Sequence, residues 1–158
     1  YIFGSLKHLS KHSSSLLMSL DQALEKLKFE YEHLSQKSIP TLINCYALQA
    51  CFKDPFQEVV GHIAITAIFE HMFTQLDHPT FLIRQTLIKD LDVALLWDFR
   101  FSLKRWNKNP QCFEGVSWLR FNQDFLVEKH QDFWDPAEGI YEKLPFIGPI
   151  MRGLKRSA

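Results

Sequence analysis

The sequence lacks an excess of charge of either sign. Its 158 residues include 18 Lys and Arg and 18 Asp and Glu. A balanced charge produces no overall field that would attract nucleic acid or an acidic membrane surface. The cluster of Lys104, Arg105, Trp106 and Lys108 is too small to change this, so we expect no nucleic-acid partner.

Long apolar runs and cysteine pairs are also scarce. No run approaches the roughly 18–20 apolar residues of a membrane helix. The three cysteines, Cys45, Cys51 and Cys112, have no Cys-x-x-Cys spacing, which is typical of reduced thiols in a cytoplasmic protein. The sequence shows no Gly-rich phosphate loop, zinc-ligand spacing or nucleophilic triad signature, so we expect neither a metal nor a cofactor.

Aromatic residues, by contrast, are abundant. They make up 14% of the chain, with 14 Phe and four Trp, enough to line an apolar cavity as well as to fill a core. The length suits one domain. Residues 1–17 show little apolar periodicity and no continuous apolar centre. We expect them to be a disordered or artefactual extension, and residues 18–158 to form a single domain.

The order of hydrophobic patterns predicts an α+β fold. Three- and four-residue spacing of apolar positions predicts helices over residues 20–34, 38–47 and 63–76. Alternation and turn-forming residues predict one short strand followed by four longer ones, over residues 50–54, 80–89, 93–106, 111–122 and 125–135. Helices followed by a meander of strands place the helices on one face of a sheet.

The segment Glu128–Asp135 carries the strongest functional signal. Read as a strand, it places His130, Asp132 and Trp134 on one face. A histidine and a carboxylate beside an indole are poor material for a plain apolar core, because buried charges are normally paired or used. Two interpretations stay open: a functional pair inside a cavity, or two side chains that satisfy each other on a solvated face.

The segments Cys51–Phe56 (CFKDPF) followed by Gly61, Trp118–Asn122 (WLRFN) and His130–Asp135 (HQDFWD) resemble the nuclear-transport-factor-2-like superfamily, in its SnoaL-like and ketosteroid-isomerase-like branch. The resemblance extends over residues 20–156. It implies a cone, in which a strongly bent, largely antiparallel sheet wraps around N-terminal helices and leaves a deep apolar pocket. Because such folds serve many functions, the reaction has to be argued from the site.

Comparison with ketosteroid isomerases implies an altered site. Asp54 stands where those enzymes have their base, but Ser117 replaces the aspartate of the oxyanion hole. Glu30 stands in the place of their oxyanion tyrosine, with Tyr31 one residue away. We therefore do not expect steroid isomerisation by that set of residues.

The same resemblance implies the residues of the pocket. Similarity to SnoaL-like cyclases makes Asp132 the candidate acid/base, with His130 as its partner and Asp54 as a second carboxylate. Asp54 could instead cap backbone amides after its strand. The remaining residues expected to line the pocket are Tyr31, Trp97, Phe99, Phe101, Ser117 and Trp134.

The expected function is binding of an apolar, steroid-like or polyketide-like small molecule. The bound molecule would be isomerised, cyclised or dehydrated by general acid/base catalysis, which would make the protein an isomerase or lyase. The alternatives are a non-catalytic carrier with the same pocket and a structural dimer with a residual cavity. We also expect a homodimer that packs through the outer sheet face at Arg100, Trp118 and Arg120. For the apolar residues 144–154 we favour a lid or subunit contact over a membrane contact.

Overall fold

The computed structural model describes residues 19–104 and 109–136. The predicted extension and the apolar tail at residues 144–154 lie outside these ranges. Along the chain, the structure contains α1 (Leu20–Glu32), the 3-10 helix η1 (Gln36–Ser38), α2 (Ile39–Ile43), β1 (Tyr46–Lys53), β2 (Glu58–Val60), α3 (His62–Gln75), β3 (Leu76–Lys89), β4 (Asp92–Leu103), β5 (Gln111–Phe121) and β6 (Val127–Trp134).

Helix α1 forms where the sequence pattern predicts it. Ser19 and Gln22 form a reciprocal capping box that satisfies the free N–H groups of the first turn. The buried side chains Ala23, Leu24, Leu27 and Tyr31 follow at helical spacing on one face. Tyr31 therefore reaches the interior from the last turn of the helix.

The second predicted helix is too long, and the first predicted strand is too short. Helix α2 ends at Ile43, and Tyr46 already belongs to β1, where it pairs with Val127 of β6. The backbone partner that draws Tyr46 into the sheet lies far along the sequence, so local periodicity gave no sign of it. The three-residue edge strand β2 was not predicted; it pairs with β1 from Cys51 to Lys53.

Strand β3 also begins earlier than predicted, directly at the end of α3. The turn-forming residues Asp77, His78 and Pro79 lie inside the strand as an irregularity in its pairing with β4. His78 has a φ of 51° there. These turn-forming residues therefore bend a continuous strand instead of forming a loop between α3 and the strand.

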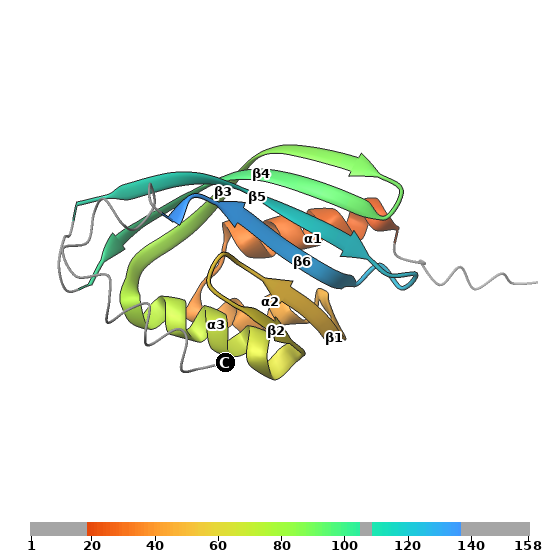
Figure 1. Ribbon diagram of the computed structural model, residues 1–158, viewed down its shortest axis with the longest axis horizontal. Coiled ribbons are helices and arrows are strands. Elements are labelled where there is room, and N and C mark those ends of the chain that lie inside the picture. The colour runs from red at the N-terminus through yellow and green to blue at the C-terminus, as the bar shows by residue number, and fades with distance from the viewer. Residues whose placement is uncertain (1–18, 105–108, 137–158) are drawn as a thin grey trace, which may run out of the picture.

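The six strands form one mixed sheet in the order β2-β1-β6-β5-β4-β3. Only β1 and β6 pair in parallel, and the other neighbours are antiparallel. In Figure 1 the long strands β3 to β6 arch over the helices, with α3 below them and α1 behind. The predicted α+β fold with a strongly bent, largely antiparallel sheet is confirmed.

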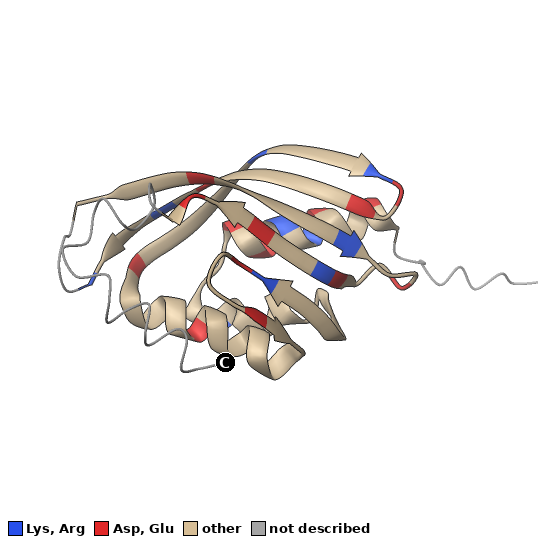
Figure 2. Ribbon diagram, in the orientation of Figure 1, with Lys and Arg blue, Asp and Glu red and all other residues tan. Residues whose placement is uncertain are grey.

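Strict alternation along β4 separates the two faces of the sheet. The inward residues Val93, Leu95, Trp97, Phe99 and Phe101 are buried and belong to the core. The outer face carries both charged and apolar side chains, among them Asp98, Arg100 and Trp118, and Figure 2 shows both signs of charge interspersed over the described chain. In the described ranges, no helix is both long and apolar enough to cross a membrane.

Candidate functional site

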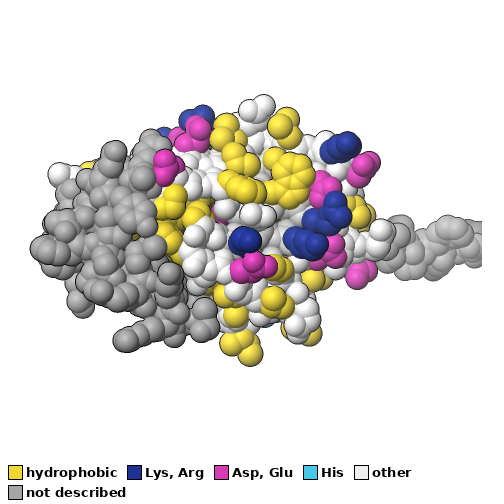
Figure 3. Space-filling view, viewed as in Figure 1, with side chains coloured by type: hydrophobic (Ala, Val, Ile, Leu, Met, Phe, Trp, Pro, Cys, Tyr) yellow, Lys and Arg dark blue, Asp and Glu magenta, His cyan; other side chains and the backbone are white. Residues whose placement is uncertain are grey.

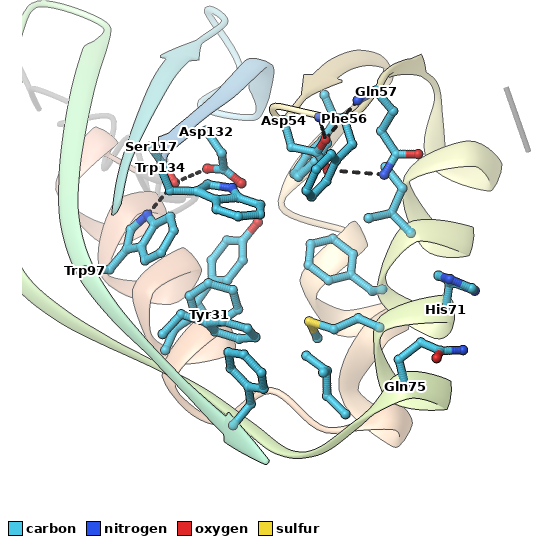
Figure 4. A pocket seen from close by; sticks show the side chains of 18 of the residues that line it. Tyr31, Asp54, Phe56, Gln57, His71, Gln75, Trp97, Ser117, Asp132 and Trp134 are labelled. Atoms are coloured by element: carbon cyan, nitrogen blue, oxygen red, sulfur yellow. Dashed lines mark hydrogen bonds between the residues drawn. The ribbon is translucent and has the colours of Figure 1, made fainter. Parts of the chain in front are cut away.

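A cavity of about 570 Å³ lies between the inner face of the sheet and helix α3. Its wall is aromatic along the sheet and includes Ala64, Ile68 and Met72 of α3. Figure 4 shows these two walls facing each other, with Tyr31 between them. All nine residues expected at the pocket line this cavity: Tyr31, Asp54, Trp97, Phe99, Phe101, Ser117, His130, Asp132 and Trp134.

Strand β6 brings the polar groups to the inner face, as its alternation predicts. His130 is buried, whereas the next outward-facing aromatic, Phe133, is half exposed. His130 Nε2 lies 2.7 Å from Asp132 Oδ1. The interpretation of these two residues as a pair on a solvated face is therefore wrong: the pair lies inside, against the cavity.

Asp132 Oδ1 receives a second hydrogen bond from the neighbouring strand β5. Ser117, its register partner, donates its hydroxyl at 2.5 Å. Trp97 of β4 donates its indole N–H to the Ser117 oxygen at 2.8 Å. Figure 4 shows this chain of three side chains from three adjacent strands. It fixes the orientation of the carboxylate before any ligand arrives.

A close approach of two strands makes this geometry possible. Gly115 is the register partner of Trp97, and the indole ring lies across it. A Cβ atom at position 115 would lie only 2.5 Å from Trp97 Cζ2 and 2.7 Å from Cζ3. Only glycine leaves room for the ring in this position.

The other ring nitrogen of His130 contacts two tyrosines. Tyr46 Oη lies 2.7 Å from His130 Nδ1, and Tyr31 Oη lies 3.5 Å from the same atom. The two tyrosine hydroxyls also contact each other directly. Burial raises the pKa of both tyrosines well above 10, so both carry their protons near neutral pH.

Tyr46 is a polar contact of the site that the sequence pattern does not predict. Helical spacing places it in the second predicted helix, where its side chain has no particular relation to β6. Tyr46 lies an even number of residues before the buried Ala50 and Phe52, as expected for side chains on one face of a strand. This pattern could have indicated a longer first strand that includes Tyr46.

Asp54 occupies a different position in the cavity wall. Its Oδ1 accepts hydrogen bonds from the backbone N–H groups of Phe56 at 2.7 Å and Gln57 at 2.9 Å. Its Oδ2 accepts one from Gln57 Nε2 at 3.1 Å. These bonds close the turn between β1 and β2, so Asp54 caps backbone amides after its strand, one of the two roles that the sequence allows. Burial raises the pKa of this carboxyl; its hydrogen bonds oppose the rise, and the Asp132 charge adds to it.

Aromatic contacts connect this turn to the sheet. Phe56 packs edge-on against Trp134 with ring centroids 5.2 Å apart. Trp134 in turn stacks on Phe113 at 4.8 Å. Asp54 and Asp132 therefore belong to one wall of aromatic rings, although no described contact joins the two carboxylates.

The outward residues of β4 stay outside this site, as their position in the strand predicts. Asp98 pairs with Arg84 of β3 at 3.0 Å and lies 3.6 Å from Arg100. Both pairs are on the outer face. Among residues 19–104 and 109–136, no group of three or more His, Cys, Asp or Glu side chains could hold a metal ion.

The sequence model of the SnoaL-like domain matches residues 30–129. A search of curated proteins found no match. The solved structures that are similar in fold include three at low sequence identity, as follows. A Burkholderia pseudomallei NTF2-like protein of unknown function is 16% identical, with a TM-score of 0.69 over 80% of this chain and 98% of that one.

The other two structures are of proteins whose names assign them a function provisionally. A Bacillus subtilis protein provisionally named an isomerase is 16% identical, with a TM-score of 0.67 over 80% of this chain and 95% of that one. A Shewanella denitrificans protein provisionally named a SnoaL-like polyketide cyclase is 14% identical, with a TM-score of 0.65 over 78% of this chain and 95% of that one. The fold is therefore NTF2-like. Because the sequence model of the SnoaL-like domain matches more than half of the chain, the chain belongs to the SnoaL-like domain family.

Proposed function

We propose that the cavity binds a largely apolar small molecule and that Asp132 transfers protons to and from it. The observation that carries this proposal is the asymmetry of the Asp132 carboxylate. Oδ1 accepts hydrogen bonds from His130 and Ser117, whereas Oδ2 has no partner among the described residues. Every fully buried polar side-chain atom of those residues is hydrogen-bonded, so Oδ2 is not fully buried. Since Asp132 lines the cavity, Oδ2 is the atom that a ligand can reach.

The surroundings suit acid/base chemistry. A carboxylate in an aromatic cavity is shielded from bulk water, which strengthens its interaction with a ligand proton. His130 and Ser117 hold the group in one orientation, so little reorganisation is needed at the moment of reaction. The reaction class is an isomerisation, cyclisation or dehydration without a cofactor, and the names of two structural neighbours lie in the same range.

Asp54 keeps its proposed place as a second carboxylate of the same cavity. Its turn-closing hydrogen bonds hold it rigidly, and burial makes its proton harder to remove. In this role it would orient the ligand or donate a proton opposite Asp132, as paired carboxylates in different environments do.

Mass spectrometry of the purified protein tests the proposal. Ligands extracted from wild type would be compared with those from Ala64→Trp, in which a large side chain on α3 fills part of the cavity. We expect an apolar compound in wild type and a loss of most of it in the variant. Equal or absent extracts from both proteins, together with no binding of any apolar dye, would contradict a ligand-binding cavity.

The carrier function is the second candidate, because every fully buried polar side-chain atom of the described residues is already hydrogen-bonded within the protein, so the cavity can hold an apolar ligand without any reaction. Incubating the extracted compound with wild type and Asp132→Asn separates the two. If the protein is an enzyme, wild type changes the compound's chromatographic retention time by isomerisation or lowers its mass by one water through dehydration. Asp132→Asn then abolishes the change. A carrier returns the compound unaltered from both proteins.

A further inference from the structure

The two tyrosines beside His130 form a path that begins and ends at the cavity. Tyr31 lines the cavity, Tyr46 lies behind its wall, and His130 and Asp132 line it again. The successive contacts are Tyr31 to Tyr46, Tyr46 to His130 Nδ1 at 2.7 Å, and His130 Nε2 to Asp132 Oδ1 at 2.7 Å. The path therefore joins two positions in the cavity without passing through it.

The direction of these hydrogen bonds follows from counting protons. The Asp132 carboxylate accepts, so His130 donates from Nε2 and a neutral ring has only a lone pair at Nδ1. Tyr46 must then donate to Nδ1, and its oxygen accepts the proton of Tyr31. Each hydroxyl has one hydrogen, so the Tyr31 oxygen is left as an acceptor toward the cavity.

We infer that Tyr31 and Tyr46 relay the proton of a ligand hydroxyl to His130, and that the ligand carries an enol or phenol group. This inference rests on the proposed function of the cavity. In the relay the ligand O–H bond breaks as Tyr31 gains that proton. Tyr31 passes its own proton to Tyr46, and Tyr46 passes its own to Nδ1. The products are a ligand oxyanion, to which Tyr31 now donates, and an imidazolium beside the Asp132 carboxylate.

The fold holds each member of the relay in position. His62, at the start of α3, donates to the backbone carbonyl of Tyr46 at 2.9 Å. The Phe52 ring packs on His130 with centroids 4.5 Å apart, and Phe81 packs edge-on against Tyr31 at 5.4 Å. Raised tyrosine pKa values keep both hydroxyls protonated, as a relay requires.

The chemistry selects the ligand class. Phenols and enols are the neutral hydroxyl compounds whose acidity comes closest to that of an imidazolium, whereas aliphatic alcohols are far weaker acids. The aromatic wall favours a flat ring system next to the hydroxyl. Such a ligand would give up its hydroxyl proton to Tyr31 and stay in the cavity as an electron-rich oxyanion, with the imidazolium of His130 as the new proton donor of the site.

The test uses nitrophenols and naphthols as probes, because their ionised forms absorb differently from the neutral ones. Spectra are recorded with full-length wild type at a pH below the pKa of each probe. We expect bound probe to be mostly ionised in wild type and at least tenfold less so in Tyr46→Phe and Tyr31→Phe. Phe29→Leu is the matched control: it changes an exposed position of α1, the helix that carries Tyr31, outside the cavity, and should leave the ionisation in place.

Nitrogen NMR of His130 provides a readout that does not depend on the probe. We expect the free protein to show protonated Nε2 and a hydrogen-bonded lone pair at Nδ1, whose resonance shifts in Tyr46→Phe and not in Phe29→Leu. A proton on Nδ1, or an Nδ1 resonance that ignores Tyr46→Phe, would overturn the relay. Probes that bind only as neutral phenols would also overturn it while leaving the ligand-binding function intact. If none binds at millimolar concentration, the hydroxyl ligand class is wrong.

Discussion

Replacing Gly115 by alanine is the sharpest test of how the cavity wall is built. The added Cβ would lie 2.5 Å from Trp97 Cζ2 and 2.7 Å from Cζ3, so the indole has to move. The ring is almost completely buried and packs against Phe81 and Phe113. Its displacement also breaks the hydrogen bond of 2.8 Å to Ser117.

The expected loss of stability follows from these two effects. Overpacking of a well-packed site costs about 1–3 kcal/mol, and the lost hydrogen bond costs roughly 1 kcal/mol more. For a domain of this size the sum corresponds to a fall in Tm of about 5–12 °C. Since Ser117 orients Asp132, binding of cavity ligands should weaken in the same variant.

A double-mutant cycle with Trp97→Phe separates the steric cause from a general effect of alanine in β5. A phenyl ring is shorter, so Gly115→Ala should cost less than about 1 kcal/mol in that background. Urea unfolding of the four proteins measures the coupling. Glu114→Ala is the control, because Glu114 is the exposed residue directly before Gly115 in β5. The variant loses only an ion pair with Arg84, which should cost at most about 1 kcal/mol of stability. The steric argument fails if Gly115→Ala costs the same with either ring or leaves the Tm unchanged.

Three further outcomes are expected. Asp132→Asn keeps an acceptor for His130 and Ser117, so it should lower the Tm by only about 2–6 °C, for a loss of roughly 1–2 kcal/mol, while abolishing turnover of the natural ligand. Burial raises the pKa of Asp54 above its ordinary value of 3.8, so the folded state holds this proton more tightly than the unfolded chain. Its stabilising effect falls as pH rises through the raised pKa, and Asp54→Asn should flatten that part of the urea stability profile. Light scattering at micromolar concentration should give a dimer mass that Trp118→Glu reduces to a monomer.

Each of these has a result that would contradict it. A collapse of folding in Asp132→Asn would make Asp132 a structural hub. A wild-type stability that instead rises with pH relative to Asp54→Asn would mean that hydrogen bonding, not burial, dominates the pKa of Asp54. For the dimer, Phe29→Glu on α1 is the control, because Phe29 is as exposed as Trp118 but lies away from the outer sheet face. A monomeric wild type would exclude the interface.

The predicted interface has a visible counterpart on the outer face. Trp118 and Phe133 are each about half exposed, at 51% and 52%. Val116 pairs with Phe133 across β5 and β6, next to Trp118. Figure 3 shows hydrophobic side chains on this side of the molecule with charged ones beside them. An apolar strip with a charged rim is typical of subunit contacts and is the surface that the predicted dimer would bury.

The faces of the long strands could be predicted from the sequence, and their ends could not. A period of two assigns a residue to a face wherever the strand begins, so Trp97, Arg100, His130 and Asp132 were placed on the correct faces. Where a strand starts depends on its partner. Tyr46 fits helical spacing after Leu42 and leaves the helix only because β6 offers it backbone hydrogen bonds.

The hydrogen-bonding roles of the site residues could not be predicted from the sequence, for a related reason. The alternation of β6 indicates that His130 and Asp132 share a face, but not which nitrogen of His130 faces Asp132. That assignment requires the tyrosines from α1 and β1, which meet the ring from the other side. The contact between Gly115 and Trp97 is equally invisible in the sequence, because it depends on the register between two strands.

The position of the carboxylate indicates what kind of site this family member has. Ketosteroid isomerases resemble this chain with an aspartate where Ser117 stands, and that aspartate donates a hydrogen bond to an oxyanion. Here the carboxylate lies one strand away, on Asp132, the register partner of Ser117. Donors from β5 and β6 converge on its Oδ1, so it stands as an acceptor and not as a donor. Asp132 is therefore suited to act as the base, and the donor to a developing oxyanion has to come from elsewhere in the cavity. Tyr31, at the far end of the relay, is placed to supply it once it has taken up the proton of the ligand.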